Sequence, residues 1–119
     1  MKFQKILPAI VAGSLIVATP YGMTQGTAQI KIGLSAPLSG SQAVVGQDQV
    51  DGFMLAVEQL GGKLGGQAVT LFKEDDQLKP EIGNQIVRKF IDKDKVDAIV
   101  GLGFSNVLMA GIKPVVESG

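Results

Sequence analysis

The sequence predicts an α/β fold in which a parallel sheet lies between two layers of helices, in the order βαβαβα. From Gln29 onward, three segments with the spacing of strands alternate with three segments with the spacing of helices. The connections are short, and the third strand segment, VDAIVG, is almost wholly apolar, which is typical of a strand covered on both faces. Right-handed crossovers then place helices on both faces of the sheet, which gives a parallel three-layer sandwich.

Residues 1–28 have the pattern of a cleavable secretory signal peptide, which leaves residues 29–119 as the folded part. Lys2 and Lys5 precede an apolar stretch, residues 6–18, that is shorter than the roughly 20 residues needed to span a membrane. The chain has no cysteine that could carry a lipid. We therefore expect a soluble periplasmic protein without stable membrane insertion after cleavage. An uncleaved anchor or a buried core helix is the alternative.

The first predicted strand covers residues 30–35 and is followed by a loop, residues 36–46, rich in proline, serine and glycine. Residues 48–60 form the first predicted helix, with Asp48 as its cap and Gly61 as its left-handed stop. The turn GGKLGG follows. The helix presents one apolar face, which consists of Val50, Phe53, Met54, Val57 and Leu60.

The second predicted strand covers residues 67–73, and a loop over residues 75–79 leads to the second helix. Pro80 occupies the first position of that helix, where a missing N–H is harmless. Glu81 lies near the positive end of the helix dipole. The buried stripe of this helix consists of Ile82, Ile86, Val87, Phe90 and Ile91.

The third predicted strand covers residues 96–101, and Ser105 or Asn106 caps the helix that follows. Pro114 lies inside this third helix at a cost of about 3 kcal/mol relative to Ala, so we expect a kink or an early end there. The apolar face of the helix consists of Leu108, Ile112, Val115 and Val116.

The composition excludes several classes of function. Lys and Arg number 11, as do Asp and Glu, and no basic cluster is present, so we expect no nucleic-acid partner. The absence of His and Cys removes the usual zinc sites and the nucleophiles that depend on either residue. We predict no catalytic residue, no metal and no cofactor. The segment after the signal is close to the lower size limit for a stable core, so we expect a fragment or a truncated reading frame.

Ligands of open parallel α/β sheets bind beyond the carboxyl ends of the strands. Three predicted segments lie there, residues 36–46, 75–79 and 103–106. The third is the best candidate, because Ser105 and Asn106 offer polar side chains and free backbone N–H groups at a helix start. The helix dipole favours a carboxylate at such a position. A role in capping alone is an equal alternative.

Two weaker motifs lie in the same region. The run GLGFSN nearly matches a dinucleotide-binding fingerprint, but its third glycine is missing and it follows the third strand, not the first. Asp75 and Asp76 form a pair of adjacent carboxylates. Neighbouring side chains of a strand point to opposite faces, so turn formation is the preferred interpretation of this pair.

The order and spacing of these motifs resemble the beginning of the type I periplasmic binding proteins, the family of the leucine/isoleucine/valine-binding protein. The resemblance spans residues 30–119. It rests on GLSAPLSG at residues 33–40, on GQDQVDGFMLAV at residues 46–57, on Asp75-Asp76 with the following Pro80, and on the strand VDAIVG.

The resemblance implies a partial amino-terminal lobe of a two-lobed binding protein that closes on a small solute and serves the membrane permease of an ABC importer. It implies that a carboxylate lies against Phe104, Ser105, Asn106 and Val107, with Ser105 as hydroxyl donor, and that Val45 lies beside the ligand. Amino-acid binders often carry a larger side chain at the position of Val45. The run FSNVLMA, by contrast, resembles relatives that take up aromatic carboxylates. The resemblance thus leaves open a branched-chain or other amino acid, or an aromatic acid, as the ligand.

The same resemblance implies that the protein is a transport protein and not an enzyme. The alternative is a Rossmann-like enzyme or a ligand-sensing domain whose active residues lie beyond Gly119.

Overall fold

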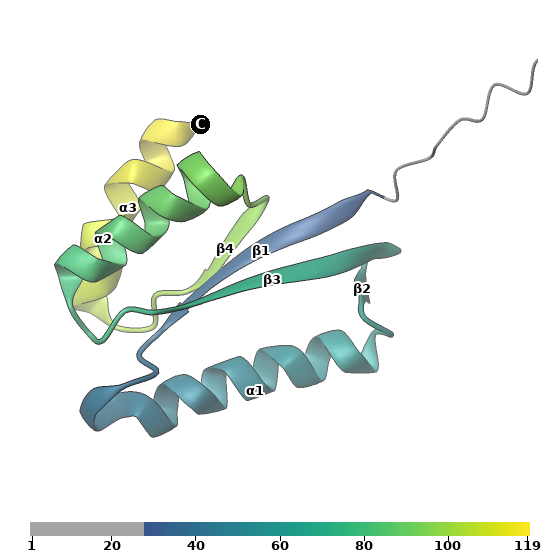
Figure 1. Cartoon of the computed structure of the whole chain (residues 1–119), viewed down its shortest axis with the longest axis horizontal. Coiled ribbons are helices and arrows are strands. Elements are labelled where there is room, and N and C mark those ends of the chain that lie inside the picture. The colour runs from purple at the N-terminus through teal and green to yellow at the C-terminus, as the bar shows by residue number, and fades with distance from the viewer. Residues whose placement is uncertain (1–27) are drawn as a thin grey trace, which may run out of the picture.

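The computed structural model describes residues 28–119 and places a four-stranded sheet between two layers of helices (Figure 1). Strands β1 (Gln29–Ala36), β3 (Gln67–Asp75) and β4 (Ala98–Gly101) are parallel, and β1 lies between the other two. The short strand β2 (Lys63–Leu64) pairs antiparallel with β3, so the strand order is β2-β3-β1-β4. The predicted α/β fold with three layers is confirmed.

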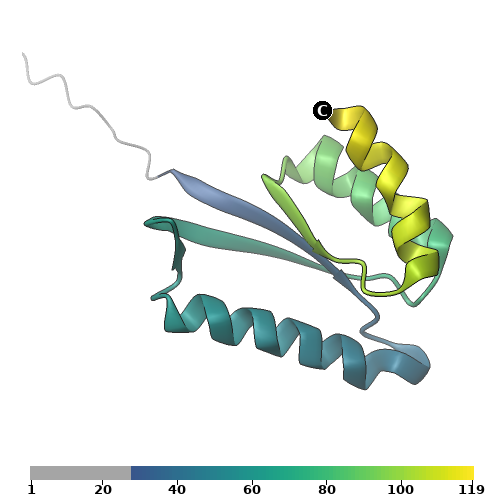
Figure 2. The ribbon, with the colours of Figure 1, turned by 180° about the vertical axis from the view of Figure 1, so that it is seen from behind.

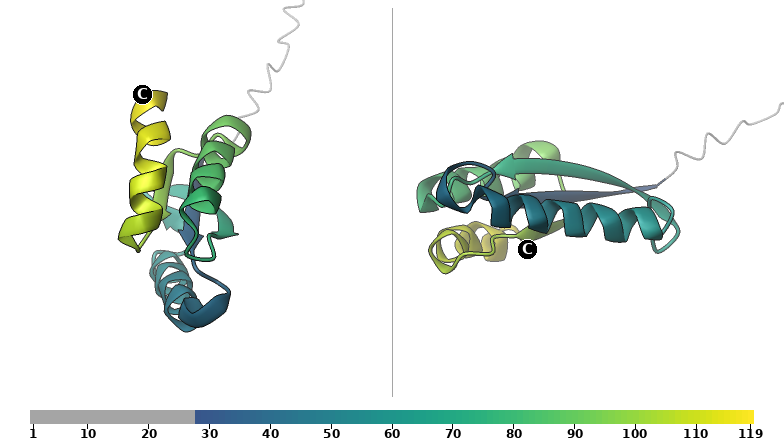
Figure 3. Two further views of the ribbon diagram at one scale, coloured as in Figure 1. Left: turned by 90° about the vertical axis from the view of Figure 1, so that its left-hand side faces the viewer. Right: turned by 90° about the horizontal axis from the view of Figure 1, so that it is seen from below.

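The helices divide between the two faces of the sheet, as the view from behind also shows (Figure 2). Helix α1 (Ala43–Gln59), preceded by the 3₁₀ turn η1 (Gly40–Gln42), covers one face. Helix α2 (Pro80–Lys89), which continues into the π-helical turn η2 (Phe90–Asp94), and helix α3 (Ser105–Ser118) cover the other. Seen end-on, the sheet lies between α1 and the α2–α3 pair (Figure 3).

Each face of the sheet has its own apolar core. Leu34, Ala36 and Val50 are buried on the α1 face. The core on the opposite face includes Val87, Leu102 and Val107. The predicted buried stripe of the second helix is confirmed, because its central members Ile86, Val87 and Phe90 are at most 6% exposed.

Helix α1 begins at Ala43, five residues before the predicted start at Asp48, and the predicted loop over residues 36–46 is correspondingly shorter. Gln42, not Asp48, occupies the N-cap position. The prediction treated Gly46 as part of a loop. Inside the helix this glycine is required by close packing, because a Cβ there would lie 1.9 Å from the carbonyl oxygen of Pro37. Gly61 has a φ of 68°, as predicted for the left-handed stop.

The glycine-rich turn after α1 also differs from its prediction, because it contains the additional strand β2. The turn reverses the chain within six residues through backbone angles that glycine adopts readily. Positive φ angles are found at Gly61, Gly62, Gly65 and Gly66. The resulting hairpin extends the sheet by one short antiparallel strand at the far side of β3.

Helix α3 continues through Pro114 to Ser118, so of the two predicted outcomes, a kink or an early end, the early end is wrong. Pro114 has no N–H to donate to the carbonyl of Ala110, four residues earlier. The Nδ2 of Asn84, on α2, donates a hydrogen bond to that carbonyl oxygen at 2.6 Å. A side chain of the neighbouring helix therefore supplies the donor that proline removes.

The apolar face predicted for the third helix is not the face that packs against α2. Leu108, Ile112 and Val115 remain 39–47% exposed, and Val116 is 73% exposed. The buried positions of α3 are instead Val107, Gly111 and Pro114. The reason is the place of β4 at the edge of the sheet, because no described element lies beyond it to cover the outer side of α3.

The predicted signal peptide over residues 1–28 falls outside the described part of the chain, except for Ala28. No helix within residues 28–119 is sufficiently long and apolar to cross a membrane.

Candidate ligand-binding site

The loops that follow β1, β3 and β4 meet at one end of the sheet, where all three parallel strands have their carboxyl ends (Figure 1). A buried pair of polar side chains joins the first two. The Ser35 hydroxyl, at the end of β1, donates a hydrogen bond of 3.0 Å to Oδ2 of Asp76. Both residues are almost completely buried, and the backbone N–H of Asp76 also donates to the carbonyl of Ala36.

Asp75 connects the same two loops at the surface. Its Oδ1 accepts hydrogen bonds from the backbone N–H groups of Leu38, at 2.8 Å, and of Gln77, at 2.9 Å. Burial acts to raise the pKa of Asp75, but hydrogen bonds from the Ser39 side chain and from the backbone outweigh it, so the pKa lies below its ordinary value. The two aspartates therefore stabilise the loops, which agrees with the preferred interpretation as turn residues.

The loop after β3 contains two consecutive residues in the left-handed region, Gln77 with φ 52° and Leu78 with φ 59°. This conformation is unfavourable for residues other than glycine, and it persists only where neighbouring groups enforce it. Here Oδ1 of Asp76 accepts from the N–H of Leu78 at 2.9 Å, and the carbonyl of Leu78 accepts from Nδ2 of Asn106 at 2.9 Å. Asn106 thus connects this loop to the start of α3.

The start of α3 differs from the prediction, because neither Ser105 nor Asn106 caps the helix. Phe104 is the N-cap residue, with extended backbone angles and no capping bond from its side chain. Ser105 is exposed, and its hydroxyl forms no hydrogen bond within residues 28–119. The backbone N–H groups of Ser105 and Asn106 are likewise without a partner among these residues, since the first capping bonds are donated by Val107 and Leu108.

The other predicted site residues occupy different environments. Phe104 is half-buried against the core that contains Val87 and Leu102. Val107 is completely buried and packs onto α2, where a Cβ at Gly83 would lie 2.4 Å from Cγ1 of Val107. Only the backbone of Val107 could therefore contact a ligand. Val45, in the first turn of α1, is 41% exposed.

The sequence did not predict the position of Gln49. Its side chain, on α1, lies against Gly103 in the loop after β4, where a Cβ would lie 2.8 Å from Nε2 of Gln49. Oε1 of Gln49 is buried and has no hydrogen-bond partner among the described residues. One signal was available, because Gln49 precedes Phe53 by one helical turn and so belongs to the apolar face of that helix.

The two glycines of the GLGFSN run have structural roles. A Cβ at Gly101 would lie 2.0 Å from the carbonyl oxygen of Ser35, which also accepts a hydrogen bond from the N–H of Leu102 at 3.0 Å. Gly101 has a φ of 94°, and Gly103 leaves room for the amide of Gln49. Close packing against β1 and α1 accounts for both glycines without a nucleotide.

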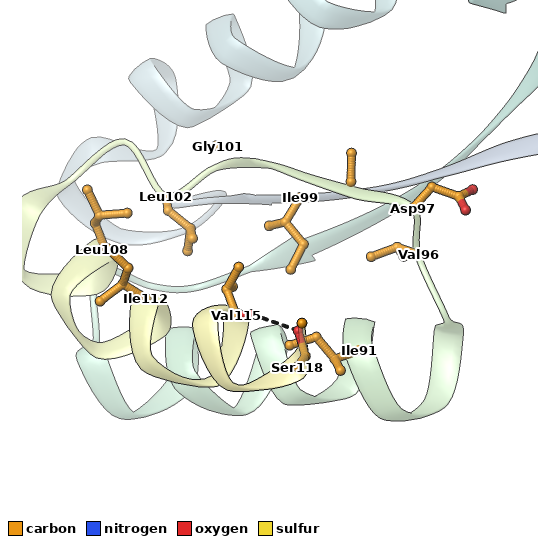
Figure 4. A pocket seen from close by; sticks show the side chains of 12 residues that line it. Ile91, Val96, Asp97, Ile99, Gly101, Leu102, Leu108, Ile112, Val115 and Ser118 are labelled. Atoms are coloured by element: carbon orange, nitrogen blue, oxygen red, sulfur yellow. Dashed lines mark hydrogen bonds between the residues drawn. The ribbon is translucent and has the colours of Figure 1, made fainter.

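A hollow beside the free edge of β4 has a volume of about 450 Å³. Figure 4 shows Leu108, Ile112 and Val115 of α3 pointing toward Ile99 and Leu102. Most side chains of the lining are apolar, and its one charged side chain, Asp97, would repel a carboxylate. Within residues 28–119, no group of three or more Asp or Glu side chains is placed to hold a metal ion.

Comparison with known proteins identifies relatives for this part of the chain. A family model described as periplasmic binding protein matches residues 29–118. An amino acid binding protein of Pseudomonas aeruginosa is 30% identical over 91 residues, which are 74% of this chain and 24% of that protein. A Leu/Ile/Val-binding protein homolog of Brucella abortus is 37% identical over 76 residues, 62% of this chain and 20% of that protein.

Solved structures show the same relationship. An ABC transporter substrate-binding protein from Sphaerobacter thermophilus has a TM-score of 0.73 and 35% identity, covering 76% of this chain and 24% of that chain. A solute binding protein from R. palustris in complex with benzoate has a TM-score of 0.69 and 35% identity, with 76% and 25% covered. Another from the same organism, in complex with 4-hydroxybenzoate, has a TM-score of 0.71 and 30% identity, with 76% and 25% covered. The chain thus spans about a quarter of the length of these proteins.

Proposed function

The chain belongs to the periplasmic binding protein family, and from this premise we propose that it is part of the substrate-binding component of an ABC importer. The family consists of solute-binding proteins and not of enzymes. In this proposal residues 29–119 form part of the amino-terminal lobe. The protein acts in the periplasm after cleavage of the signal peptide and delivers its solute to a membrane permease.

We propose that the solute is small and bears a carboxylate. The similar proteins are named for an amino acid, or were crystallised with benzoate or 4-hydroxybenzoate, and each of these molecules has a carboxylate group. The observation that supports this class of ligand in the present chain is the start of α3. The exposed Ser105 hydroxyl and two backbone N–H groups without described partners lie there, at the carboxyl end of β4.

These donors suit a carboxylate for two physical reasons. A helix start carries partial positive charge, which stabilises an anion. Hydrogen bonds to an ionised group are also shorter and stronger than bonds between neutral groups. Hydrogen bonds that Asp75 and Asp76 accept, and one that Asn106 donates, hold the surrounding loops before any solute arrives, so little loop entropy is lost on binding. Closure of a second lobe over the solute then completes the site.

The test is a titration of the complete protein with leucine, benzoate and 4-hydroxybenzoate by calorimetry, repeated with Ser105→Ala. The variant loses one charge-assisted hydrogen bond, which contributes about 1.5–3 kcal/mol and corresponds to roughly 10- to 100-fold weaker binding. Ser118→Ala is the matched control, because Ser118 is an exposed serine at the other end of α3.

The control variant should bind as tightly as the unmodified protein. The proposal fails if no carboxylate binds the unmodified protein, and the role of Ser105 fails if Ser105→Ala leaves the affinity unchanged.

A further inference from the structure

Gln49 lines a hollow whose lining includes none of the five predicted site residues Val45, Phe104, Ser105, Asn106 and Val107. The hollow has a volume of about 260 Å³ and lies between α1, β1 and the segment after β4. Its lining consists of Leu34, Gln49, Phe53, Val100, Gly101 and Gly103. Apolar walls with a few polar groups are the usual composition of a small-molecule site. The side-chain amide of Gln49 is the single polar side chain in this lining.

The amide of Gln49 is incompletely satisfied in the folded chain. Oε1 is buried and accepts no hydrogen bond from any residue that the structure describes. Buried polar atoms of native proteins nearly always have a partner, and leaving one without is costly. Gln49 lines a hollow with apolar walls, so a rotation of its side chain would present this acceptor to a donor that arrives with a ligand.

The position of this acceptor relates it to the carboxylate site. The amide lies against Gly103, and Gly103 precedes Ser105 by two residues in the same loop. Gly101 and Gly103 belong to the carboxyl-terminal side of β4, as does the start of α3. Gly103, which lines the hollow, therefore connects it along the chain to the proposed carboxylate position at Ser105.

We propose that Gln49 is a specificity-determining contact, whose Oε1 accepts a hydrogen bond from an O–H or N–H group of the solute. This inference rests on the proposed function. The ligand is a carboxylate that carries a separate hydrogen-bond donor, either the ammonium group of an amino acid or the hydroxyl group of an aromatic acid. The apolar walls formed by Leu34, Phe53 and Val100 accommodate its hydrocarbon part.

Two matched pairs of solutes distinguish these donors. 4-Hydroxybenzoate differs from benzoate by one hydroxyl, and leucine differs from 4-methylpentanoate by its ammonium group. Calorimetry on the complete protein should show that one donor-bearing solute binds at least about tenfold more tightly than its partner, since a site built to hydrogen-bond a group rejects the analogue that lacks it. The pair that shows this preference identifies the donor.

The decisive variant is Gln49→Met, which keeps the length of the side chain and removes the acceptor. We expect this variant to bind the donor-bearing solute about tenfold more weakly, or weaker still. Its affinity for the solute of the same pair that lacks the donor should change less than about threefold. Gln59→Met is the matched control, because Gln59 is an exposed glutamine at the end of the same helix. It should preserve the preference of the unmodified protein.

A folding defect is separable from loss of the contact. Gln49→Met removes a buried acceptor without a described partner, so its melting temperature should not fall. Gln49→Leu serves as a second apolar replacement. An unchanged preference in both variants, or an equal loss of affinity for both members of a pair, overturns the role of Gln49. If no carboxylate binds the unmodified protein, the proposed function fails first and this inference fails with it.

Discussion

The contact between Asn84 and the carbonyl of Ala110 leads to a quantitative prediction. Pro114 removes the backbone donor for this carbonyl, and Nδ2 of Asn84 replaces it at 2.6 Å. The variant Asn84→Ala leaves the half-buried carbonyl oxygen without that donor. An unsatisfied buried acceptor costs about 1–3 kcal/mol, and partial burial of Ala110 places the expected loss near the lower end, at about 1–2 kcal/mol.

A double-mutant cycle isolates this contact. In the variant Pro114→Ala, the new backbone N–H at position 114 can donate to the Ala110 carbonyl within the helix. Asn84→Ala should then lower the free energy of unfolding by less than about 0.5 kcal/mol, so the two substitutions should couple by about 1 kcal/mol.

Urea unfolding followed by circular dichroism measures all four proteins of the cycle. Asn84 also accepts a hydrogen bond from Nε of Arg88 at 3.1 Å, and Arg88→Ala controls for its loss. This bond is exposed, so the control should cost less than about 0.5 kcal/mol. An equal cost of Asn84→Ala in both backgrounds would refute the assignment of Asn84 as the replacement donor.

Two further predictions concern glycine packing and pH. Gly83→Ala should destabilise the protein by about 1–3 kcal/mol, because the new Cβ would lie 2.4 Å from Val107. Gly52→Ala has open space around it and should stabilise helix α1 by up to about 1 kcal/mol. Urea unfolding measures both variants, and a similar effect of the two would contradict the packing of α2 on α3. Because the folded-state pKa of Asp75 is lowered, its contribution to stability should be complete above the unfolded-state pKa of about 4 and should disappear as pH falls through the folded-state value. Asp75→Asn should therefore show a smaller loss of stability than the unmodified protein as the pH falls below about 4, and identical pH profiles would disprove this role.

Much of the fold could be predicted from local patterns. Pro80 marks the first residue of α2, Gly61 adopts the left-handed conformation after α1, and the buried residues of α2 follow the predicted stripe. These features depend on backbone preferences and hydrophobic periodicity, which are properties of residues close together in the sequence.

Predictions from the sequence were wrong where segments that are distant in the chain pack against one another. Gly46 and Gly83 were uninformative as single residues, yet each provides the space for a close contact, with Pro37 and with Val107 respectively. The orientation of α3 could not be predicted from its large apolar residues, because the buried contact with α2 uses Val107, Gly111 and Pro114. A small residue contributes little to a hydrophobic pattern but permits the closest approach of two helices.

For the candidate site, too, the sequence predicted some features and the tertiary structure was needed for others. By itself, the sequence determined the order of strands and helices, and therefore which loops share the carboxyl end of the sheet, because the alternation of parallel strands and crossover helices leaves no other end for them. Only the tertiary structure decided which polar groups remain available there. Nδ2 of Asn106 donates a hydrogen bond to the carbonyl of Leu78. Ser105 is exposed, and Oε1 of Gln49 is buried without a described partner. Hydrogen-bond satisfaction depends on atoms that are far apart in the chain, so it is decided when the helices and loops pack together.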